Sequence, residues 1–99
     1  MEKNMERVRE LLDKPELFCQ LAEECQELGK AALKLRRAMT GTNPTPLTET
    51  EAWRNLTTEI ADVMACLKVL QIPTDDAMIR GIQEYKMGRW VRRLEEGQA

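Results

Sequence analysis

The feature that most constrains the fold is an apolar stripe between residues 15 and 40. Its side chains recur in alternating steps of four and three, the spacing of one face of an α-helix. The stripe contains Leu17, Leu21, Leu28, Ala31, Leu35 and Met39, and Glu24 occupies one of its positions. A carboxylate that faces a core needs a proton, a cation or a metal ion to offset its desolvation. The pattern therefore predicts a helix with one buried face and a charge that requires a partner.

Three further segments have helical spacing, at residues 2–13, 49–72 and 75–96, and nothing in the chain alternates as a strand does. Residues 41–47 contain two prolines and cannot continue a helix, so we expect a loop there. At 99 residues the chain predicts one all-α domain. Its two long helices should form an antiparallel hairpin within a four-helix bundle, and a domain of this size gains from oligomerisation.

Capping residues predict where these helices begin and end. Gly41 stands where a helix C-terminus is expected, and Thr48-Glu-Thr-Glu51 matches a capping box in which Thr48 caps the next helix and Glu51 reaches back. Pro73 should end that helix, and Thr74 can cap the fourth one.

Two carboxylate pairs lie on the two long helices, as Glu24-x-x-Glu27 and Glu59-x-x-Asp62. A spacing of three places both members of a pair on one helix face. Glu24 and Glu27 lie 14 to 17 residues before Gly41, and the second pair lies 12 to 15 residues after Leu47. In an antiparallel hairpin both pairs are then at the same height, so four carboxylates can share a metal ion.

The residue inventory excludes several kinds of site. The chain has no histidine, and its three cysteines form no C-x-x-C pair. A zinc finger, a Cys–His nucleophile and a Ser–His–Asp triad are therefore ruled out. A set of glutamate and aspartate oxygens matches Mg²⁺, with Mn²⁺ as a substitute.

Charge and hydropathy limit the partners. The net charge is −2, from 15 basic and 17 acidic residues, and the basic residues form no long run, so we expect no nucleic-acid polymer as partner. No apolar run approaches the roughly 18 residues of a membrane span. The N-terminus is charged and lacks an apolar signal segment. We therefore expect a cytoplasmic protein that has no membrane partner and keeps its cysteines reduced.

The fourth predicted helix carries basic residues that fit a phosphate substrate. Lys86, Arg89 and Arg93 follow steps of three and four, so they share one face. A nucleoside triphosphate brings about four negative charges, which need cations beyond the metal ions. Asn55, one turn before Glu59, is a further candidate for substrate binding, to sugar or phosphate.

The arrangement of Glu24-Cys-Gln-Glu27, Glu59-Ile-Ala-Asp62 and Lys86-x-x-Arg89 with Arg93 resembles the MazG-like all-α nucleoside triphosphate pyrophosphohydrolases. The resemblance covers about residues 17–93. It implies Mg²⁺-dependent hydrolysis of nucleoside or deoxynucleoside triphosphates to monophosphate and pyrophosphate. By matching position, the four acids would be catalytic metal ligands, and Lys86 and Arg93 would contact phosphate. It also implies a homodimer or homotetramer with sites at subunit contacts.

A second interpretation is a non-enzymatic helical oligomer that serves as a protein-interaction module. Its carboxylates would then form salt bridges between subunits. Trp53 and Trp90 can stack on a nucleobase in the enzyme and can pack at an interface in either case. A response of the melting temperature to Mg²⁺ separates the two interpretations, because only the enzyme should bind the ion.

Overall fold

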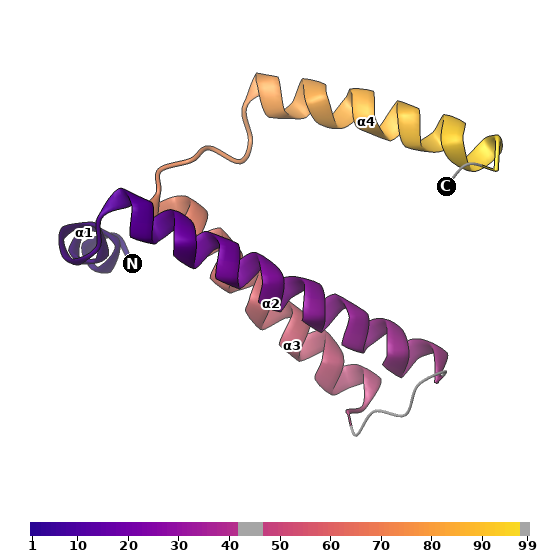
Figure 1. Cartoon of the computed structure of the whole chain (residues 1–99), viewed down its shortest axis with the longest axis horizontal. Coiled ribbons are helices and arrows are strands. Elements are labelled where there is room, and N and C mark those ends of the chain that lie inside the picture. Colours follow the sequence, from indigo (N-terminus) through magenta and orange to yellow (C-terminus); the bar gives the residue numbers. More distant parts are fainter. Residues whose placement is uncertain (42–46, 98–99) are drawn as a thin grey trace.

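The computed structural model describes residues 1–41 and 47–97, and in this part of the chain the regular structure is helical throughout. Its four helices are α1 (Glu2–Leu11), α2 (Lys14–Thr40), α3 (Glu49–Val69) and α4 (Ala77–Glu95). Helices α2 and α3 lie side by side as an antiparallel hairpin, and α1 crosses the end at which α2 begins and α3 finishes (Figure 1). The predicted all-α fold is confirmed. Most of the predicted 41–47 loop lies outside the described residues.

The boundaries of the hairpin follow from its capping residues. Asp13 caps α2 by accepting a hydrogen bond from the Glu16 backbone N–H at 3.0 Å. Gly41 ends α2 in the left-handed conformation, with φ of 63°, which glycine adopts without a steric penalty. Thr48 caps α3, because its hydroxyl oxygen accepts from the Glu51 backbone N–H at 3.1 Å. The Glu51 carboxylate reaches back to the cap residue, where it accepts a bond from the Thr48 hydroxyl at 3.1 Å in place of the backbone N–H bond of a full capping box.

The boundary between α3 and α4 differs from the prediction. Helix α3 stops at Val69, before Pro73, because Gln71 adopts a left-handed φ of 61° and Ile72 N–H then bonds the Leu67 carbonyl at 3.0 Å. This is a Schellman-type end, which breaks the helix without proline.

The cap of α4 is Asp76, so the expected Thr74 cap is wrong. The Asp76 carboxylate accepts from the Ile79 backbone N–H at 2.8 Å. Thr74 lies two residues too early to reach the free N–H groups of the first turn, which starts at Ala77.

The buried core is small and belongs to the first three helices. Buried side chains are Leu17, Ala31, Leu35, Ala52, Val69 and Leu70. At the open end of the hairpin, Leu17, Val69 and Leu70 form one cluster, and Met5 and Val8 of α1 pack against it. Met39, a member of the predicted stripe, is exposed instead. Ala52, which the stripe did not include, is fully buried because it is small enough to sit between the two helices.

Helix α4 lies apart from the hairpin, which makes the chain open (Figure 1). The accessible surface is 7853 Å², whereas a compact monomer of this mass exposes about 5,800 Å². The radius of gyration is 17.1 Å, against about 13 Å for a compact chain of this length. No described helix combines the length and apolarity needed to cross a bilayer.

Candidate metal centre

Three carboxylates converge between α2 and α3. Glu24 of α2 and Glu59 and Asp62 of α3 each offer an oxygen, and these oxygens lie within 4.8 Å of one another. Glu24 and Glu59 are half-buried at the helix interface, and Asp62 is exposed at its edge. Antiparallel packing brings these residues to one height, because each lies a similar number of residues from the connection between the helices.

Glu27 lies beside this cluster and is not part of it. Its carboxylate forms an exposed ion pair with Lys30 at 3.3 Å. Glu24 is oriented by Gln20, whose amide donates to its carboxylate at 2.9 Å. Within residues 1–41 and 47–97, neither lysine nor arginine forms an ion pair with Glu24, Glu59 or Asp62. Among the described residues, the three converging carboxylates therefore have no lysine or arginine within ion-pair distance.

The electrostatics of the cluster fit a cation site. Burial raises the pKa of Glu59 above its usual value, and the neighbouring charges of Asp62, Glu24 and Glu27 raise it further. Lys34 acts in the opposite direction and lowers it. A bound divalent cation would remove the repulsion among these acids.

Cys66 lies close to the cluster, one turn beyond Asp62 on α3. Burial raises the pKa of its thiol, and Glu24, Asp62 and Cys25 add to the rise. The Cys66 sulfur is not among the converging ligand atoms, so the donor set of the cluster is oxygen only. Lys34 and Cys66 were not among the predicted site residues. Cys66 follows Asp62 by four residues, so helical spacing alone could have placed it here.

The distances suit an octahedral ion after a small movement. Ligand oxygens at 2.0–2.1 Å from Mg²⁺ lie about 2.9 Å apart when adjacent and about 4.1 Å apart when opposite. The spacing within 4.8 Å therefore needs to close by at most about 2 Å. Rotation of glutamate side chains can supply that movement. Three protein oxygens would leave the remaining positions of an octahedral ion to water or other oxygen donors.

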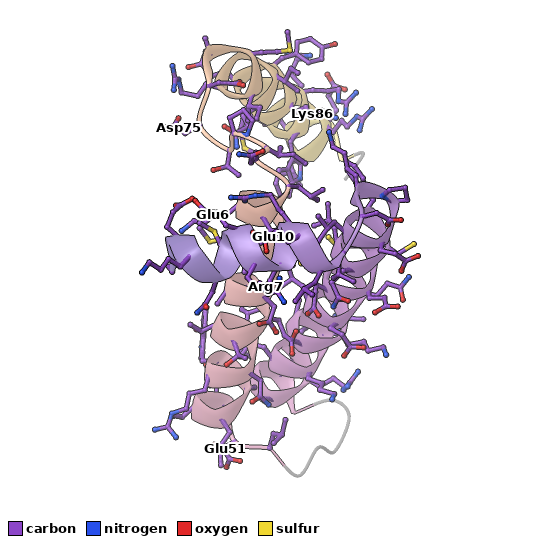
Figure 2. The ribbon with its side chains drawn as sticks, turned by 90° about the vertical axis from the view of Figure 1, so that its left-hand side faces the viewer. Glu6, Arg7, Glu10, Glu51, Asp75 and Lys86 are labelled. Atoms are coloured by element: carbon purple, nitrogen blue, oxygen red, sulfur yellow. The ribbon has the colours of Figure 1, made fainter. Side chains whose placement is uncertain are left out.

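The other predicted site residues are not brought to this cluster within one chain. Lys86, Arg89 and Arg93 lie on α4, which runs apart from the hairpin (Figure 1), and Figure 2 labels Lys86 on this helix. Asn55 is exposed on α3, one turn before Glu59.

The Trp53 and Trp90 side chains, which could stack on a base, are both about half exposed. A cavity of about 250 Å³ lies at the open end of the hairpin, where α1 crosses it, and is lined by Arg9, Leu17 and Gln71 among others. None of the predicted site residues lines it.

No protein-family model, curated protein or solved structure matches this chain. The geometry of the carboxylates therefore carries the functional argument.

Proposed function

We propose that this protein is a Mg²⁺-dependent nucleoside triphosphate pyrophosphohydrolase of MazG-like type, with Mn²⁺ as a substitute ion. The observation that carries the proposal is the convergence of Glu24, Glu59 and Asp62 from two helices, the two glutamates half-buried and none of the three in an ion pair with a described lysine or arginine. Exposed helices often carry isolated acidic pairs. Acids that meet across a helix interface are less readily explained as solvated surface, because each costs desolvation and repels the others.

The residues have distinct roles in this proposal. The carboxylates of Glu24, Glu59 and Asp62 would hold the metal, and Glu27 at the flank would join them by leaving Lys30. A bound divalent metal polarises phosphoryl oxygens and lowers the pKa of a coordinated water. Water adds to the α-phosphorus, the bond from that phosphorus to the bridging oxygen breaks, and pyrophosphate leaves. The chain needs no nucleophilic side chain for this reaction.

The test is a substrate panel with matched variants. The purified protein is incubated with each nucleoside and deoxynucleoside triphosphate in Mg²⁺, and the products are separated by ion-exchange chromatography. We expect monophosphate and pyrophosphate from at least one substrate. Glu59→Gln should lower kcat at least a hundredfold, since it removes a charged ligand from the transition-state site.

The control for this experiment is Glu23→Gln, which removes the same charge from an exposed position beside Glu24. It should keep the full rate. The enzyme proposal fails if no substrate is cleaved between the α and β phosphates, or if Glu59→Gln is as active as Glu23→Gln.

One observation favours the second candidate function, a helical interaction module. Helix α4 exposes large apolar side chains, including Met78 at 75% and Tyr85 at 65%, as a partner-binding helix would. A module of this kind should show no change in melting temperature with Mg²⁺ or phosphate analogues, whereas the enzyme should be stabilised by both.

A further inference from the structure

The cavity of about 250 Å³ at the open end of the hairpin lies apart from the metal centre. Helix α1 lies across this end (Figure 2), and the lining comes from the corner between α1 and α2 and from the end of α3. Leu17, which lines the cavity, precedes Glu24 by seven residues, or about 10 Å along α2. The proposed hydrolysis therefore does not use this cavity.

The floor of the cavity is apolar. It consists of Leu17, Val69 and Leu70, each at most 8% exposed, and Leu12 adds an apolar side chain nearer the surface. Pockets for drug-sized ligands measure about 300–1,000 Å³, so the ligand of this cavity has to be smaller. An apolar cavity of about 150 Å³ binds benzene. The volume here therefore has room for one ring, or a branched chain of similar size, with a short polar group.

The half-buried guanidinium of Arg9 places a fixed positive charge beside this floor. Its Nη1 donates to the Val69 carbonyl oxygen at 3.1 Å, which holds the group in position. Its Nη2 lies 3.7 Å from the Glu2 carboxylate, which is too far for a hydrogen bond. Glu2 is also exposed to solvent and neutralises the guanidinium only weakly. Arg9 therefore keeps N–H donors for an anionic ligand.

Two further polar side chains of the lining, Lys14 and Gln71, have no partner within residues 1–41 and 47–97. Asp13 is the one acidic residue among the described lining residues, and its carboxylate already accepts the Glu16 backbone N–H as the cap of α2. The lining thus has two cations, Arg9 and Lys14, against one carboxylate. This charge favours a ligand with a single negative charge.

The backbone of Gln71 supports a role for its side chain at the cavity. Gln71 has a φ of 61° and is the only non-glycine residue with a positive φ in the described part of the chain. A side chain at this φ costs free energy relative to glycine, and residues held in this way cluster at ligand sites. The amide of Gln71 provides a hydrogen-bond donor that glycine at this position would lack.

We propose that the cavity binds a small carboxylic acid with one negative charge and a compact apolar body, of about the size of 3-phenylpropanoate. The carboxylate accepts hydrogen bonds from Arg9, Lys14 and the Gln71 amide, because these donors surround an otherwise apolar space. The apolar body covers Leu17 and Val69. This ligand joins the corner of α1 and α2 to the end of α3, and its binding is independent of the proposed hydrolysis.

The first experiment locates the ligand. Full-length ¹⁵N-labelled protein at pH 7 is titrated with 3-phenylpropanoate, and the backbone amide resonances are followed by NMR. We expect saturable shifts at Leu12, Lys14 and Gln71, whereas Glu24 and Glu59 should keep their positions. Shifts that do not saturate, or that saturate only at residues outside the cavity lining, would overturn the proposal.

Matched ligands test whether the charge is recognised. The amide 3-phenylpropanamide has the same shape as the acid and no charge, so it should bind about tenfold more weakly. The amine 3-phenylpropan-1-amine has the opposite charge and should not bind. Equal affinity for the acid and the amide would overturn the proposal, because the cavity would then recognise only the apolar body.

Variants test the donors. Lys14→Gln should weaken binding of the acid about tenfold, since it removes a charged donor from an exposed position. Lys3→Gln removes the same charge from α1 outside the lining and should keep the wild-type affinity. Circular dichroism checks that each variant is folded.

Gln71→Gly separates a ligand-binding role from a structural one. The variant should melt at a higher temperature than wild type, because glycine accepts the left-handed φ, and should nevertheless bind the acid about fivefold more weakly. A structural role alone predicts the higher melting temperature with unchanged affinity. Unchanged affinity in both Gln71→Gly and Lys14→Gln would overturn the proposal.

Discussion

Replacing Glu59 by Gln tests the metal centre through protein stability. The side chain keeps its size and loses its charge, so the repulsion from Asp62 and Glu24 disappears. Without metal we therefore expect a higher melting temperature for the variant than for wild type. With Mg²⁺ or Mn²⁺ at a hundred times the dissociation constant, wild type should gain about 11–22 °C. The variant should gain far less, because one of the three oxygen ligands within 4.8 Å no longer carries a charge.

The pH dependence of this effect has a defined sign. The pKa of Glu59 is raised in the folded protein above its usual 4.5, so the folded state holds the proton to higher pH than the unfolded state does. The contribution of this group thus lowers stability as pH rises above about 4.5. The metal-dependent gain should grow over the same window, because the ion competes with the proton.

The assay is thermal unfolding followed by circular dichroism from pH 4.5 to 7.5, with and without metal, and Glu23→Gln is the control. Glu23 is exposed, so its variant should respond to metal as wild type does. The reasoning is refuted if metal-free Glu59→Gln melts below wild type, or if both proteins gain equally from the ion.

Three further predictions concern the fold. Leu35→Ala should lower the free energy of unfolding by about 2–5 kcal/mol, since Leu35 is buried between α2 and α3; urea denaturation measures it, and a loss below 1 kcal/mol would contradict the packing. Asp76→Ala should cost about 1 kcal/mol by removing the cap of α4, seen as lost helicity near 77–80 in amide hydrogen exchange. Gln71→Gly should raise stability by about 1 kcal/mol, because glycine accepts the left-handed φ of 61°; a lower melting temperature would argue against that backbone geometry.

The hairpin could be predicted from the sequence because its signals are local. Gly41 ends α2 by its backbone conformation, and Thr48 supplies an N-cap for α3. The common height of Glu24 and Asp62 follows from counting residues out from the turn, since the helical rise is constant.

The role of Glu27 and the boundary between α3 and α4 could not be predicted, because neighbouring residues compete for the same interaction and a periodic pattern does not show which one forms it. Glu27 shares a helix face with Glu24, but a lysine three residues away pairs with it at the surface. Asp76 caps α4 in place of Thr74, since both residue types can serve as an N-cap. Helix α3 ends before Pro73 because Gln71 adopts the left-handed conformation. The apolar side chains of α4, such as Met78 and Tyr85, are exposed, and their pattern in the sequence does not identify a surface that packs against them.

Crystallography with Mn²⁺ can show whether the carboxylates of the hairpin hold a metal ion. Anomalous scattering from crystals grown with MnCl₂ locates the ion independently of the protein chain. We predict a manganese peak between α2 and α3, coordinated by oxygens of Glu24, Glu59 and Asp62. This prediction would be contradicted by well-ordered density in which these three side chains diverge into solvent and no anomalous peak lies between them.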